Sequence, residues 1–170
     1  VMIVLLIVLI IIIILLVAFY IFYKNVKNVK SIISVASNNI LTLLDQKKEL
    51  IDQTIELLNS KKLKNDFVYD DEWSVFDKDN ALFKIRVDIS NYLNGQGKKK
   101  NSDEVHDLIK NIDTIDEDIE GLKNFYNSKV LDYKNLYDKK IFNLLFKLFK
   151  IESVNMCKSR KLDDFEILKN

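Results

Sequence analysis

Residues 1–23 read VMIVLLIVLIIIIILLVAFYIFY, and no charged side chain appears before Lys24. At ~1.5 Å per residue, a helix of this stretch is about 34 Å long, which is enough to cross a hydrocarbon core of ~30 Å. A helix that is apolar on every side has no face to turn toward water, and buried core helices seldom exceed ~14 apolar residues. A cleaved signal peptide is disfavoured, because the stretch has no basic n-region and no small-residue cleavage site follows it. The stretch therefore predicts a transmembrane helix.

Aromatic and basic residues follow one another at the C-terminal end of this stretch. Aromatic rings favour the headgroup region, and lysines close to a span stay on the cytoplasmic side. We therefore expect a single-pass protein of the inner (plasma) membrane, with its N-terminus outside, residues 24–170 in the cytoplasm, and membrane lipid as a partner. The expected membrane-interface residues are Phe19, Tyr20, Phe22, Tyr23, Lys24, Lys27 and Lys30.

The composition of the remaining chain favours long helices and argues against catalysis. The sequence has no proline and three glycines, so few residues interrupt helices. Its 26 basic and 25 acidic residues balance, whereas nucleic-acid-binding proteins need a dense basic face, so no nucleic-acid partner is expected. Cys157 and His106 are single residues of their type, which leaves no Cys/His metal site, no disulfide framework and no catalytic pair. We expect a protein that is not an enzyme and that holds no cofactor or metal.

Three helices are expected after the span, at 24–63, 80–94 and 102–150. In the first, apolar residues recur at alternating spacings of three and four, the pattern of a helix seam, with Lys47 and Thr54 as interruptions. The second is expected to begin at a cap formed by Asp79 or Asn80. Together with the span they predict an all-α fold: an N-terminal transmembrane helix that continues into a long antiparallel up-and-down bundle of three main helices plus a short C-terminal piece.

The third helix carries the longest unbroken seam, which then shifts toward the C-terminus. The acids between residues 113 and 120 fall largely between seam positions, so we expect them to face solvent. Gly121 lies inside this helix, where it allows either close packing or a slight bend. The seam residues are Val105, Leu108, Ile112, Ile115, Ile119, Leu122 and Tyr126, followed by the shifted positions Val130, Tyr133 and Tyr137.

Residues 64–79 lack helical periodicity because aromatic and acidic residues alternate there. Two interpretations fit: a short β-hairpin around Asp70–Glu72, or an irregular loop against the end of the bundle. In either case Trp73 is expected to anchor the segment.

An antiparallel pairing of the first and third helices has a consequence for the C-terminal part. If position 103 lies opposite about 64, position 143 lies opposite about 24, which returns the segment IFNLLFKLFK (141–150) to the membrane surface. The segment then either lies at the headgroup boundary or packs wholly into the bundle. The domains expected are an anchor at 1–23, a bundle at 24–150 and a polar tail at 151–170. The residues expected in the interfacial return segment are Phe142, Leu145, Phe146 and Phe149.

The sequence resembles the LemA family of bacterial membrane proteins. FYNSKVLDYKN (125–135) followed by NLLFKLFK (143–150) is similar to the family pattern Y-Y-N-x-x-V-x-x-Y-N and N-L-I-A-K-L-F. Three positions depart from the pattern: Ser37 replaces a tryptophan, and Asp52 and Ile141 replace prolines. A second match in the first helix covers Ala36, Ile40, Leu44, Leu50, Ile51 and Ile55, and the C-terminal motif positions are Phe125, Tyr126, Asn127, Val130, Tyr133 and Asn143.

The resemblance implies a single N-terminal anchor and a cytosolic helical bundle, and it implies no particular activity. We expect a non-catalytic scaffold or adaptor; the alternative is a membrane-linked signalling or stress-response component that transmits through its long helix. Polar motif residues such as Tyr126 and Asn127 need partners when buried, either within the seam or at a partner surface. The protein partner is not identified by the sequence, and self-assembly into a homo-oligomer is one alternative.

Overall fold

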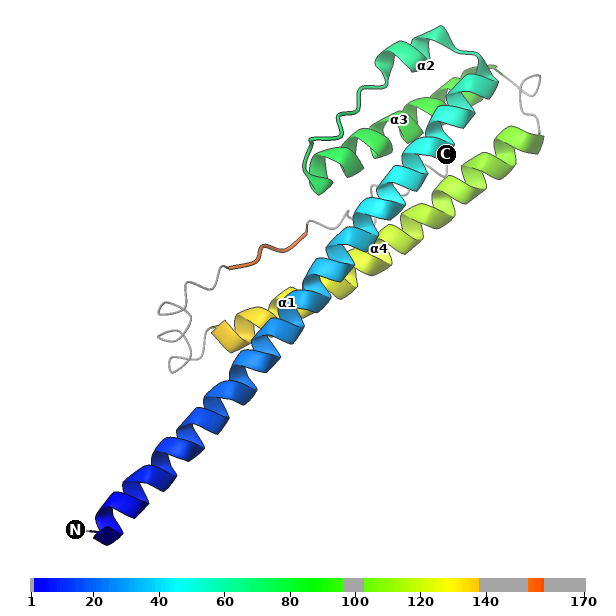
Figure 1. Cartoon of the computed structure of the whole chain (residues 1–170). Coiled ribbons are helices and arrows are strands. Elements are labelled where there is room, and N and C mark those ends of the chain that lie inside the picture. The colour runs from blue at the N-terminus through cyan, green and yellow to red at the C-terminus, as the bar shows by residue number, and fades with distance from the viewer. Residues whose placement is uncertain (1, 97–102, 138–152, 158–170) are drawn as a thin grey trace. The chain divides into compact units, whose positions relative to one another are not determined.

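The computed structural model describes residues 2–96, 103–137 and 153–157, and all regular secondary structure in these ranges is helical (Figure 1). The elements are α1 (Met2–Leu58), α2 (Lys61–Asp66), α3 (Val75–Gln96) and α4 (Asp103–Tyr137). The predicted all-α fold is confirmed. The expected continuation of the third helix to residue 150 lies outside the described residues.

The chain divides into two compact units, and α1 and α4 each contribute to both. The first unit comprises Val1–Val35 and Ser128–Asn155, and the second comprises Ala36–Asn127 and Met156–Asn170. In the first unit, the buried apolar side chains that the structure describes are Phe22, Val26, Ile33, Val130 and Tyr133.

The core of the second unit is built from one face of each of its helices. Isoleucine and leucine dominate this core, and several of these side chains are fully buried, as expected for close-packed helix seams. The buried apolar residues are Ala36, Ile40, Leu44, Ile51, Ile55 and Leu58 of α1, Leu63 of α2, Leu82, Ile85 and Ile89 of α3, and Val105, Ile112, Ile119 and Tyr126 of α4.

Within the second unit, α1 and α4 run antiparallel, as predicted (Figure 1). The expected register places residue 120 opposite Lys47, whereas Lys47 pairs with Asp116, about one helical turn away. Helix α3 also runs antiparallel to α4, since Asp79 and Arg86 near its start and middle pair with residues 123 and 113, respectively. α3 therefore runs in the same direction as α1, and α2 with residues 67–74 provides the return connection (Figure 1).

Helix α1 ends at Leu58 rather than near Leu63, because Asn59 leaves the helical conformation. Asn59 has φ 47°, a left-handed backbone that asparagine tolerates better than most residues and that often terminates helices. Ser60 then caps the short helix α2, and its hydroxyl accepts a hydrogen bond from the Leu63 backbone N–H at 3.4 Å.

Helix α3 begins at Val75, five residues before the expected start. The Ser74 hydroxyl accepts a hydrogen bond from the Asp77 backbone N–H at 3.2 Å and donates one to the Asp77 carboxylate at 2.6 Å. This reciprocal cap uses Ser74 as the first residue, which makes the expected cap at Asp79 or Asn80 wrong. Asp79 is instead buried inside the second unit.

Residues 67–74 form an irregular connection, and no strand occurs in this segment. The Asp70 carboxylate accepts a hydrogen bond from the Glu72 backbone N–H at 2.9 Å, and the Trp73 N–H donates to the Asp70 carbonyl at 3.2 Å. These contacts form a turn at the position of the hairpin alternative, but the flanking residues do not pair as strands. The irregular-loop interpretation is the one that agrees with the structure.

Candidate functional site

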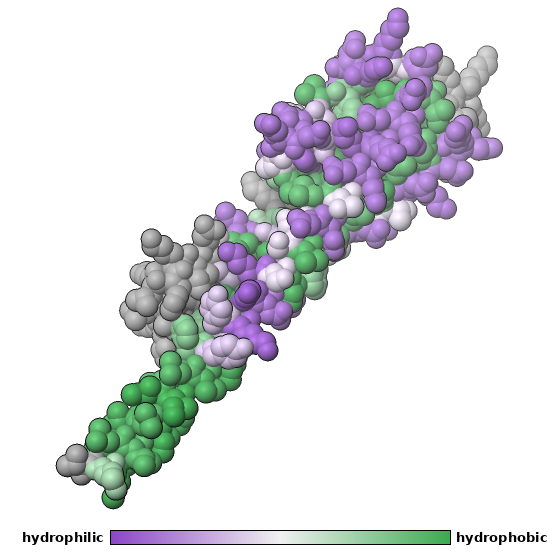
Figure 2. All heavy atoms as spheres, in the orientation of Figure 1, coloured by the Kyte–Doolittle hydropathy of each residue, from purple (hydrophilic) through white to green (hydrophobic). Residues whose placement is uncertain are grey.

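The first feature with functional meaning is the apolar start of α1. Every side chain from residue 2 to residue 17 is exposed, with fractions of 47% or more, so no protein core covers them. Figure 2 shows this part of α1 as a continuous hydrophobic surface. Among the described residues, α1 is the one helix long and apolar enough to cross a membrane.

The expected membrane-interface residues follow directly along α1, and most of them are exposed. Tyr20 and Tyr23 are exposed, as are all three lysines at positions 24, 27 and 30, and Phe19 is half-buried. Phe22 differs, since only 8% of it is exposed. Phe22 therefore belongs to the apolar packing of the first unit rather than to an exposed aromatic belt.

The second unit contains a buried ion pair between α1 and α4. Lys47 Nζ lies 2.5 Å from Asp116 Oδ1, and the two side chains are 0% and 4% exposed. A buried charge without a partner is strongly unfavourable, so each residue requires the other. Lys47 therefore does not interrupt the seam of α1; it occupies a seam position with a partner on α4.

Two further ion-pair groups link α3 to α4. The Arg86 guanidinium forms a bidentate ion pair with the Asp113 carboxylate, and both hydrogen bonds are 3.0 Å long. Lys123 Nζ lies 2.5 Å from Asp79 and 2.7 Å from Glu120, and Lys123 and Asp79 are each 3% exposed. Burial raises the pKa of the Asp113 carboxyl even though Arg86 acts to lower it.

The prediction that the acids between residues 113 and 120 face solvent is therefore wrong for Asp116 and only partly right for Asp113 and Glu120. Their positive partners lie on α1, α3 and α4 itself, and these cannot be identified from the spacing within one helix. Thr54, the other expected interruption of the α1 seam, is also buried, and its hydroxyl donates to the Leu50 carbonyl at 2.7 Å.

The motif positions on α4 lie on different faces of the helix. Tyr126, Val130 and Tyr133 are buried, whereas Phe125 is 46% exposed. The Asn127 side chain forms two hydrogen bonds with the backbone of Cys157, each at 2.8 Å. Asn143 and the interfacial return residues 142, 145, 146 and 149 lie outside the described residues.

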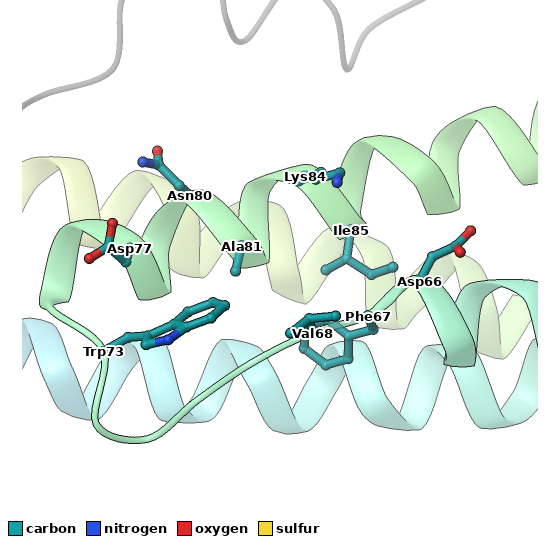
Figure 3. Close-up of a pocket in the computed structure, with 9 residues that line it drawn as sticks. All are labelled: Asp66, Phe67, Val68, Trp73, Asp77, Asn80, Ala81, Lys84 and Ile85. Atoms are coloured by element: carbon teal, nitrogen blue, oxygen red, sulfur yellow. The ribbon is translucent and has the colours of Figure 1, made fainter.

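A pocket of about 410 Å³ lies between α3 and the segment that precedes it. Figure 3 shows the rings of Trp73 and Phe67 on the side of α3 to which Ala81 and Ile85 point. Trp73 is half-buried there, consistent with its expected role as an anchor of this segment. The remaining lining residues are Asp66, Val68, Asp77, Asn80 and Lys84.

Tyr69 is half-buried and lies between the side chains of two lysines of the same unit. Lys48 Nζ is 5.3 Å and Lys78 Nζ is 5.8 Å from the centre of the Tyr69 ring, within the range of cation–π attraction. Burial, together with the negative charges of Asp45 and Asp71, raises the pKa of Tyr69 to about 12. These contacts attach the irregular segment to both α1 and α3.

No group of three or more His, Cys, Asp or Glu side chains suited to a metal ion occurs in the described part of the chain. Comparison with protein-family models, with curated proteins and with solved structures found no match to this chain. The functional argument therefore depends on the residues of the chain itself.

Proposed function

We propose that this chain is a membrane-anchored, non-catalytic helical scaffold or adaptor of the LemA type, with its bundle at the cytoplasmic face of a bacterial membrane. One observation carries the proposal: α1 runs without interruption from an uncovered apolar stretch into helical packing with buried seams. A span of this length and apolarity is stable in lipid, and exposed to water it would cause aggregation.

The partner-binding part of the proposal is supported by apolar side chains near the Trp73 pocket. Val68 and Phe76 are 64% and 43% exposed, and Val68 lines the pocket. Aromatic and apolar side chains beside a pocket are typical centres of protein interfaces. We therefore assign this surface, defined by Val68, Trp73 and Phe76, as the partner surface of the adaptor.

The LemA-type part of the proposal rests on the sequence motif alone. The apolar and aromatic motif residues Val130 and Tyr133 are buried in the first unit, and Tyr126 is buried in the second. Burial at these positions is expected of apolar and aromatic residues in any helical bundle. The alternative role, a signalling component that transmits through α1, stays a prediction.

Single-cysteine labelling in bacterial spheroplasts tests the topology. In a Cys157→Ser background, Asn38→Cys and Met2→Cys place a thiol at exposed positions on either side of the apolar stretch. We expect a membrane-impermeant maleimide to label the residue-2 thiol in intact spheroplasts and the residue-38 thiol only after permeabilisation. The reverse pattern, or equal labelling at both sites, would refute the proposed orientation.

In-cell photocrosslinking tests the partner surface. A photoreactive amino acid at position 68 or 76 is compared with one at position 124, an exposed site on α4 outside this surface. The proposal expects the same protein to be captured from positions 68 and 76 and not from position 124. Capture that does not depend on position would contradict the assignment of this surface.

A further inference from the structure

The pocket beside Trp73 combines an apolar floor with an acidic rim (Figure 3). Ile85 is only 2% exposed, and the rings of Trp73 and Phe67 lie on the side of α3 to which it points. Asp77 lies beside Trp73 at one end of the pocket, and Asp66 lies at the other end (Figure 3). Both acids are exposed, so their carboxylates are accessible to a partner that covers the apolar floor.

The segment that contributes both acids is strongly acidic. Residues 66–77 contain no lysine or arginine, and all their acidic side chains are exposed. Among the described residues that line the pocket, Lys84 is the one basic side chain. The surface around the apolar floor is therefore mainly negative, which is complementary to a basic partner. The acidic residues are Asp66, Asp70, Asp71, Glu72 and Asp77.

The same segment already binds lysine side chains of its own chain. Lys48 Nζ and Lys78 Nζ lie 5.3 Å and 5.8 Å from the centre of the Tyr69 ring. Tryptophan attracts cations more strongly than tyrosine does. The neighbouring Asp77 carboxylate accepts one hydroxyl hydrogen bond at 2.6 Å, and a carboxylate can accept about four. Trp73 and Asp77 together are therefore suited to a lysine or arginine side chain of a partner.

We propose that this pocket binds a segment of a partner protein in which an apolar side chain is flanked by lysine or arginine. The apolar side chain enters the pocket of about 410 Å³, and the flanking cations pair with Asp66 and Asp77. The inference rests on the partner surface assigned above and adds the chemistry of the partner. A protein segment fits better than a small molecule, because Val68 lines the pocket and is 64% exposed, so apolar contact continues outside it.

The first measurement uses the fluorescence of Trp73, the only tryptophan of the chain. The full chain in a non-ionic detergent is titrated with the peptide KKFLKK, which contains no tryptophan. We expect the emission of Trp73 to shift as the peptide covers the indole ring. The peptides EEFLEE and KKSSKK should each bind roughly tenfold more weakly, because one reverses the charge and the other lacks the apolar side chains.

Two exposed substitutions should change the affinity for KKFLKK in opposite directions. Asp66→Lys should weaken binding roughly tenfold and Lys84→Glu should strengthen it by a similar factor, because each changes the charge of the rim by two. Asp118→Lys makes the same charge change at an exposed position of α4 that does not line the pocket, and it should alter the affinity by less than about twofold. A disturbance of folding does not explain a gain at one position and a loss at the other.

The second measurement separates this inference from the adaptor role. Mass spectrometry identifies the segment captured by the photoreactive residue at position 68, and we expect an apolar residue flanked by lysine or arginine. Position-specific capture of a segment without basic residues would leave the adaptor role in place and overturn the basic partner. Equal binding of KKFLKK and EEFLEE, or no response of Trp73 emission to KKFLKK, would overturn it as well.

Discussion

Lys47 and Asp116 illustrate the energetics of charge inside this bundle. Both side chains are almost fully buried and lie within 2.5 Å of each other, so each neutralises a charge that would otherwise be desolvated without compensation. Such a pair adds little net stability compared with apolar residues, but removing one partner is costly. The pair also ties α1 to α4 at one register, because a shift of either helix separates the charges.

Substitution at this pair should distinguish loss of one partner from loss of both. Asp116→Ala is expected to lower the free energy of unfolding by about 3–5 kcal/mol, because Lys47 stays buried without a partner. Lys47→Met combined with Asp116→Leu should recover most of that loss. Denaturant unfolding of the full chain in detergent, followed by circular dichroism, measures both changes.

The matched control is Asp52→Ala, which removes the exposed partner of Lys48 one turn further along α1. A change within about 1 kcal/mol is expected there, as for surface ion pairs in general. Equal losses for Asp116→Ala and Asp52→Ala would contradict the role assigned to the buried pair.

Tyr69 gives the structure a specific response to alkaline pH. Its pKa rises from 10.0 to about 12 on folding, so between these values the folded chain holds a proton that the unfolded chain has lost. The contribution of Tyr69 to stability is therefore fully present below pH 10 and is lost as the pH rises toward 12. We expect the free energy of unfolding to fall more steeply over this range in the unmodified chain than in Tyr69→Phe, as measured by denaturant titration at each pH. Identical slopes would show that the phenol is not perturbed.

At the scale of the element, the helices follow seams that continue through polar residues. From residue 112 onward the buried positions of α4 are 112, 116, 119, 123, 126, 130 and 133, an unbroken alternation of four and three. If only apolar residues are counted, Ile115 and Leu122 take the place of positions 116 and 123 in the seam. The seam must then shift by one position near Val130. When Asp116 and Lys123 are counted as seam positions, the seam continues to Tyr133 without a shift. This continuity indicates buried charge at both positions, and a search for apolar residues alone does not detect it.

The ends of the helices depend on local hydrogen bonds and backbone conformations that are difficult to predict from the sequence. The Ser74–Asp77 cap fits a known pattern, yet the acids around residues 77–80 offer several competing caps. The end of α1 depends on the left-handed conformation of Asn59, which asparagine permits but does not require. Helix existence was therefore predictable here, and helix ends were not.

Gly121 provides a test of packing on α4. The close-packing interpretation finds no support, since a methyl group added at Gly121 would meet nothing within 4 Å and the position is exposed. Gly121→Ala should raise the free energy of unfolding by about 1 kcal/mol through helix propensity alone. Thermal unfolding of the full chain measures the change, and a destabilised variant would indicate that a neighbour approaches this position.

For the whole molecule, the sequence predicted the all-α fold, the continuous first helix and its antiparallel partner, because long apolar periodicity dominates these features. The pocket beside Trp73 and the hydrogen bonds between Asn127 and Cys157 could not be predicted. The pocket depends on the course of an irregular loop, and the hydrogen bonds join residues 30 positions apart in the sequence. Asn127 was recognised as a polar residue that needs a partner, but nothing in its local pattern points to the Cys157 backbone.

The central claim is that residues 2–23 anchor the bundle in a membrane, and alkaline carbonate extraction of bacterial membranes tests it most directly. The full chain should stay in the membrane pellet, as an integral protein does. A chain with arginine at Ile10, Ile11 and Ile12 should leave the pellet, because each central arginine costs roughly 2.5–3.5 kcal/mol of insertion energy. Val35→Arg, an exposed position on α1 outside the apolar stretch, is the control and should stay in the pellet. Release of the unmodified chain into the carbonate supernatant would contradict the account.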